Sequence, residues 1–156
     1  MRRLAAALLL AACLAHPVTA KAADPAWPQG LYGSVRMSPE TGDLGGMELH
    51  FFQAEGRAMV EAVVCEGWCN ETHTAPLERT AQGFAFRYVE RYEGGEGVSE
   101  TAYRVTLTPA RRGFRAHLTT EADPATPSWE VDPVLRPLKR AFGLQVAHSE
   151  QGATGD

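Results

Sequence analysis

The chain has 156 residues and a formal net charge of −4, and 44% of its residues are hydrophobic. These values are typical of one globular domain and exclude a chain that is disordered throughout. The acidic balance also argues against a nucleic-acid partner, which requires a basic surface.

Residues 1–22 have the three parts of a secretory signal peptide. Two arginines follow Met1, an uncharged apolar run extends over residues 4–14, and small residues end at Ala20 and Ala22. The run is much shorter than the roughly 20 residues that span a bilayer. We therefore expect cleavage near Ala20 or Ala22, export to the periplasm or the exterior, and no transmembrane anchor.

The same segment also contains an alternative cleavage site for the signal peptide. Leu10-Ala11-Ala12-Cys13 resembles a bacterial lipobox, in which the cysteine becomes the lipidated first residue of the mature chain. The resemblance implies a membrane-anchored lipoprotein with its lipid on Cys13. We favour ordinary cleavage, because cutting before Cys13 leaves an unusually short signal.

Residues 23–148 form a single predicted domain of short strands. Hydrophobic and polar residues alternate in runs separated by Gly-rich and Pro-rich turns, which is typical of β-structure. We predict an all-β fold, an antiparallel meander of six to eight strands that forms a small barrel, a half-barrel or a sandwich. The layout is similar to that of lipocalin-like barrels in architecture alone. The expected strands are Leu31–Met37, Met47–Gln53, Arg57–Cys65, Asn70–Leu77, Phe84–Tyr92, Val98–Leu107 and Phe114–Leu118.

The C-terminal part breaks this pattern. Asp132 before Pro133 resembles a helix N-cap followed by proline at the first helical position. Pro137 does not fit inside a continuing helix, so we predict short helical turns here. Residues 149–156 are expected to form a disordered tail.

Two cysteines follow the signal, at positions 65 and 69. In an oxidising compartment we expect a disulfide between Cys65 and Cys69. Gly67 supplies the unusual backbone angles of a tight loop. That loop presents Glu66 and Trp68 as a candidate partner-binding site.

Residues with catalytic or metal-binding chemistry are scattered. Cys65, Cys69 and His73 recur every four residues, but the polar, turn-forming residues around them oppose a helical zinc site. His50 and His117 each face outward on a predicted strand. We find no nucleophile motif and no phosphate-binding loop, and we expect no catalytic residue, metal or cofactor.

Aromatic residues dominate one predicted strand face. Phe84, Phe86, Tyr88 and Tyr92 share that face, and Tyr103 joins them from the returning strand. Inside a closed barrel these side chains either fill the core or line a site for one small ligand.

These observations lead to three hypotheses. The leading one is an exported, non-enzymatic β domain that binds a small apolar ligand or an envelope protein. The second is a small periplasmic enzyme, a hydrolase or a metal-dependent one, using His50 and His117 or the Cys65, Cys69 and His73 group. The third is a structural or inhibitory protein that acts through the Cys65–Cys69 loop.

Overall fold

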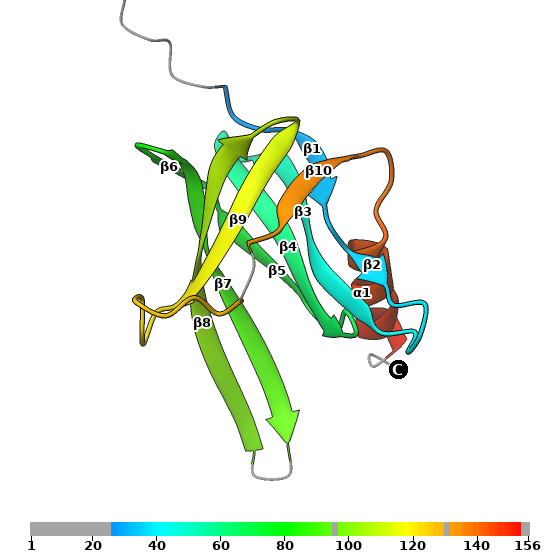
Figure 1. Cartoon of the computed structure of the whole chain (residues 1–156). Helices are drawn as coiled ribbons and strands as arrows, with labels where there is room; N and C mark the ends of the chain where they lie inside the picture. The colour runs from blue at the N-terminus through cyan, green and yellow to red at the C-terminus, as the bar shows by residue number, and fades with distance from the viewer. Residues whose placement is uncertain (1–25, 95–96, 130–131, 154–156) are drawn as a thin grey trace, which may run out of the picture.

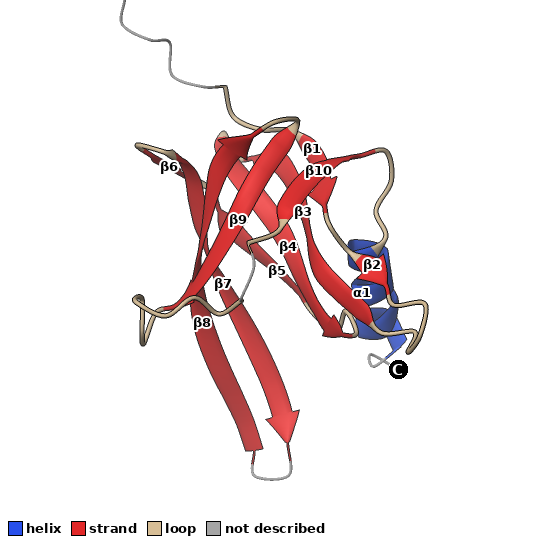
Figure 2. Cartoon of the chain, viewed as in Figure 1, coloured by secondary structure: helices blue, strands red, loops and turns tan. Residues whose placement is uncertain are grey.

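The structure, a computed structural model, describes residues 26–94, 97–129 and 132–153. The predicted signal peptide, Cys13 and residues 154–156 lie outside the described residues. Ten strands and one helix make up the described part (Figures 1 and 2). They are β1 (Gly30–Gly33), β2 (Arg36–Met37), β3 (Leu44–Ala54), β4 (Arg57–Gly67), β5 (Thr72–Pro76), β6 (Glu78–Thr80), β7 (Gly83–Gly94), β8 (Gly97–Ala110), β9 (Gly113–Thr120), β10 (Val134–Leu138) and α1 (Gly143–Ala153).

The strands form one antiparallel sheet that is nearly closed into a barrel, which confirms the predicted fold class. Chain neighbours pair from β3 to β5 and from β6 to β10, and β1 joins the two halves. Leu31 of β1 pairs with Leu138 of β10 on one side and with His50 of β3 on the other. At the remaining seam, β5 and β7 lie side by side. There the His73 ring packs edge-on against the Tyr88 ring, with 5.8 Å between their centroids.

The barrel interior is filled by side chains from nearly every strand. Alternation along β3 turns Leu49 and Phe51 inward, as the period of two predicts. The Phe114 ring packs edge-on against the rings of Phe51 and Tyr32, at 5.8 and 5.1 Å. Such edge-to-face contacts stabilise a core beyond the area they bury. The buried inner core is Met47, Leu49, Phe51, Val60, Ala62, Ala75, Leu77, Phe84, Phe86, Tyr88, Val105, Leu107, Phe114, Ala116, Leu118 and Leu135.

A smaller second core lies outside the barrel, where α1 packs on β3 and β4 (Figure 1). Val63 and Cys65 of β4 meet Leu144 and Ala147 of the helix. The helix approaches so closely that a Cβ added to Gly143 would lie 3.0 Å from Val35. Among the described residues, no helix is long and apolar enough to cross a membrane.

The helix start is held by a buried side chain from the sheet. Glu48 of β3 is fully buried and accepts hydrogen bonds from the backbone N–H groups of Phe142 and Gly143, at 3.0 Å each. The first N–H groups of a helix have no partner within the helix. A carboxylate distant in sequence therefore caps α1.

The predicted helical turns at Asp132, Pro133 and Pro137 are wrong. Pro137 lies in β10 and pairs with Tyr32 of β1. Asp132 does not cap a helix but pairs with His117, with 2.7 Å between Asp132 Oδ1 and His117 Nδ1. Pairing on both sides of β10 overrides the local preference. The helix forms later, over Gly143–Ala153, and so includes residues that we had assigned to the tail.

Candidate functional site

The structure separates the aromatic residues that we predicted either as core or as the lining of a ligand site. Phe84, Phe86 and Tyr88 are buried in the inner core. Tyr103 is half-buried, and burial, followed by the charge of Glu90, raises its pKa to about 12. Tyr92 is 69% exposed on the part of the β7–β8 hairpin that projects beyond the barrel (Figure 1). The first three fill the barrel rather than line a hollow.

The disulfide between Cys65 and Cys69 is present, and Gly67 has the positive φ, 81°, that the loop requires. Both cysteines are buried against α1. Trp68 is 42% exposed, as expected for a presented loop. Glu66 instead turns to another partner, since its Oε1 accepts a hydrogen bond of 2.8 Å from the indole N–H of Trp129.

The four histidines in the described part of the chain lie in three separate places. His50 of β3 and His148 of α1 both face Glu61 of β4, with His148 Nε2 2.6 Å from its carboxylate. His117 pairs with a carboxylate on the β9 side of the barrel. His73 lies at the β5–β7 seam. Within residues 26–94, 97–129 and 132–153, no group of three His, Cys, Asp or Glu side chains is arranged to hold a metal ion.

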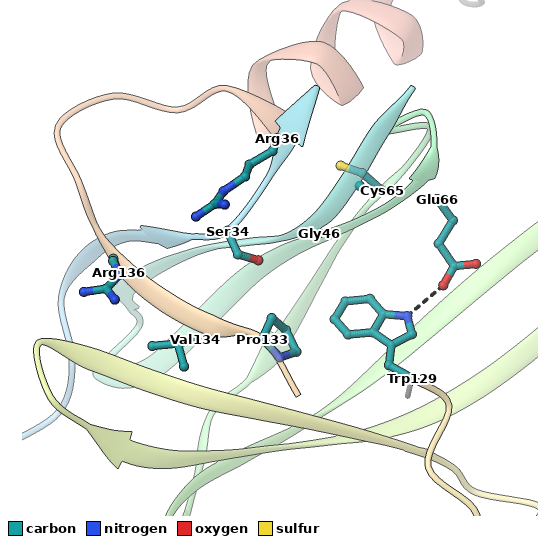
Figure 3. Close-up of a pocket in the computed structure, with 10 residues that line it drawn as sticks. Ser34, Arg36, Gly46, Cys65, Glu66, Trp129, Pro133, Val134 and Arg136 are labelled. Atoms are coloured by element: carbon teal, nitrogen blue, oxygen red, sulfur yellow. Dashed lines mark hydrogen bonds between the residues drawn. The ribbon is translucent and has the colours of Figure 1, made fainter. Parts of the chain in front are cut away.

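One hollow lies between β2, the ends of β3 and β4, and the start of β10 (Figure 3). We call it the Trp129 pocket. Its volume is about 620 Å³, within the range of small-molecule sites. It is lined by Ser34, Arg36, Gly45, Gly46, Cys65, Glu66, Trp129, Pro133, Val134 and Arg136.

The floor of the Trp129 pocket depends on a close approach of two backbone segments. Gly46 has φ of 122°, and a Cβ there would lie 2.9 Å from the backbone oxygen of Ser34. The Ser34 hydroxyl accepts a hydrogen bond from the backbone N–H of Met47 at 3.2 Å. A Cβ at Gly45 would meet nothing within 4 Å. The chain therefore requires glycine at one of these two adjacent positions, Gly46.

One wall of the pocket is an indole ring held in place at both ends. The Trp129 ring packs against the inner core, and its N–H donates to Glu66. The N–H of a partly buried tryptophan normally finds such a partner. Figure 3 shows Trp129 and Glu66 on one side of the pocket and Arg36 and Arg136 on the other. The pocket therefore has an aromatic side and a cationic side.

A second hollow of about 740 Å³ continues from the first. Ser34, Arg36, Val134 and Arg136 line both of them. We call the second one the basic pocket, because Lys139 and Arg140 also line it.

Most residues of the Trp129 pocket were not predicted from the sequence. Glu66 was singled out as a loop residue, but Ser34, Arg36, Trp129 and Arg136 were not. They come from segments about one hundred residues apart that the pairing of β1 with β10 brings together. The one local signal was a tryptophan in an otherwise proline-rich, polar stretch.

Comparison with known proteins adds no assignment to this geometry. No protein-family model matches the chain, and no curated protein or solved structure matches it significantly.

Proposed function

We propose that this protein is an exported, non-enzymatic β-barrel protein that binds a small molecule with an apolar body in the Trp129 pocket. The observation that carries the proposal is the indole of Trp129, which forms one wall of a 620 Å³ hollow. An aromatic surface held at both ends loses little conformational entropy when a ligand packs on it.

The packing of the barrel supports this location over its interior. The Phe114 ring lies 5.8 Å from the Phe51 ring and 6.0 Å from the Phe84 ring. These contacts occupy the space in which a lipocalin-like barrel would hold a ligand. A ligand therefore finds room at the pocket beside the barrel rather than among the aromatic residues of the interior.

The placement of the histidines does not favour the enzyme alternative. His50 lies on β3 and His117 on β9, and β1 and β10 separate these strands in the sheet. Export is supported by the signal-like N-terminal sequence and by a disulfide of the kind that forms in oxidising compartments.

The test is a fluorescence titration with N-phenyl-1-naphthylamine, a neutral apolar probe. We expect binding to the unmodified protein and about tenfold weaker binding to Trp129→Ala, because stacking area is lost. Trp27→Ala is the matched control, since Trp27 packs on Phe84 and Arg79 away from the pocket. Equal affinity in the two variants, with both folded by circular dichroism, would contradict the proposal.

Exposure of Trp68 favours a second candidate, an envelope protein that binds the Cys65–Cys69 loop. A large exposed aromatic residue on a loop held by a disulfide is suited to be an interface anchor. The test is purification of the exported protein from periplasm with and without Trp68→Ala. A stoichiometric partner that is lost in the variant supports this candidate, and a partner retained by it rejects the loop as the contact.

A further inference from the structure

The cations around the Trp129 pocket differ from the arginines on the β7–β8 side of the barrel. Three arginines on the β7–β8 side pair with carboxylates, as Arg87 does with Glu121 at 3.0 Å. By contrast, Arg36, Arg136 and the neighbouring Lys139 and Arg140 have no ion pair with another described residue. These four cations come from β2, from β10 and from the segment after β10. The fold gathers positive charge at one place in a chain of net charge −4.

Among the described residues, two carboxylates line the Trp129 pocket or the basic pocket, and both already accept hydrogen bonds. Glu48 lines the basic pocket but is fully buried and receives hydrogen bonds from Phe142 and Gly143. Glu66 lines the Trp129 pocket and receives the N–H of Trp129. Neither one is paired with Arg36 or Arg136.

The two arginines stand where the hollows join. Arg36 and Arg136 line both pockets, and Trp129 lines only the first. Figure 3 shows Arg36 and Arg136 across the pocket from Trp129. A ligand that spans the Trp129 pocket would contact a flat apolar surface at one end and guanidinium groups at the other.

We infer that the ligand of the Trp129 pocket is an amphiphilic organic anion. Its carboxylate, phosphate or sulfonate head lies between Arg36 and Arg136, and its apolar body lies on Trp129. Guanidinium groups bind such oxyanions through paired, charge-assisted hydrogen bonds. This inference rests on the proposed function and adds the chemical class of the ligand.

The experiment compares two probes with the same aromatic body. 8-Anilino-1-naphthalenesulfonate carries a sulfonate, and N-phenyl-1-naphthylamine lacks it. We expect the double variant R36Q/R136Q to bind the sulfonate probe at least tenfold more weakly and the neutral probe within twofold of the unmodified protein. The control R57Q/R111Q removes the same charge outside the pocket and should bind both probes as the unmodified protein does.

The outcomes separate this inference from the proposed function. If R36Q/R136Q and R57Q/R111Q bind the sulfonate probe equally, the inference is wrong, although neutral-probe binding that depends on Trp129 keeps the proposed function. If neither probe binds the unmodified protein, both are wrong.

Competitors then identify the source of the anion. We expect decanoate to displace the sulfonate probe at concentrations where inorganic phosphate does not. Equal displacement by phosphate would contradict the inference that the ligand needs an apolar body. The protein is then sedimented with vesicles of phosphatidylglycerol or of phosphatidylcholine. Binding to the phosphatidylglycerol vesicles alone, lost in R36Q/R136Q, would identify the ligand as an anionic lipid. Displacement by decanoate without such sedimentation would assign a dissolved amphiphile.

Discussion

Strands β3 and β4 have a core on each face, and the two cores are built from different chemistry. The inner face contributes Phe51 to a set of packed rings drawn from the whole barrel. The outer face contributes Val63, Cys65 and a buried carboxylate to the contact with α1. The inner core is stabilised by close packing of apolar side chains. The outer core is stabilised also by the hydrogen bonds from the start of α1 to Glu48.

The difference shows how the two faces of one sheet can pack in different ways, one against the other strands of the barrel and one against a helix. Packing in the inner core is non-directional and shared by nearly every strand, so each residue stabilises the whole barrel. The outer core docks a helix of 11 residues, which would be marginal by itself in water. Glu48 fixes where that helix begins, because its carboxylate accepts the N–H groups of the first turn.

The largest expected effect is in the inner core. Replacing Phe51 with alanine should lower the free energy of unfolding by about 4 kcal/mol, because the change leaves a cavity among packed rings. The matched control is Phe52→Ala, one residue along β3 on the other face and only half-buried. We expect a loss of about 1 kcal/mol there. Urea denaturation measures both, and equal losses would contradict the assignment of faces.

An intermediate and local effect is expected for Glu48. Glu48→Ala leaves the N–H groups of Phe142 and Gly143, the second of them buried, without their acceptor, which costs about 3 kcal/mol. The loss should fall on α1, so its amides should exchange faster with solvent while those of β8 and β9 keep their protection. Glu40→Ala, at an exposed turn, is the control. Uniformly faster exchange throughout the barrel would show that the hydrogen bonds of Glu48 do not stabilise α1 locally.

The smallest effect concerns the seam between β5 and β7. Burial, and then the charge of Arg87, lowers the pKa of His73 below its ordinary value of 6.5. The unfolded chain therefore binds the proton more readily, and stability should decrease as pH falls below about 6.5 through the lowered value. Partial exposure of His73 keeps the effect small.

The measurement is the free energy of unfolding of the unmodified protein and of His73→Gln between pH 7.5 and 5. The variant should lose less stability over this interval. Identical slopes would mean that His73 protonation does not act on the seam.

The alternation of residues was sufficient to predict β3, β4, β5, β7, β8 and β9, because each has buried residues on one face, whereas the three residues of β6 have none and were not predicted. It could not predict β10, since Pro137 is a poor strand residue and only pairing with β1 and β9 holds this segment extended. The start of α1 was equally hidden, because its cap, Glu48, lies 94 residues earlier in the sequence than Phe142. The disulfide was predictable because both partners lie in one short loop.

The candidate site followed the same rule. Trp129, Arg36 and Arg136 carry no motif, and their juxtaposition arises from the pairing of distant strands. Local patterns cannot report such contacts.

The pairing of β1 with β10 also has a consequence for how the protein is made. Leu31 finds its partner only when Leu138 has been synthesised, so the sheet stays open for nearly the whole time that the chain emerges from the ribosome. Closing so long a loop is slow. Until then both β1 and β9 expose unpaired edges that invite association with other chains. Together with the proposed export, such late closure would let the chain cross a membrane unfolded and complete its fold on the other side.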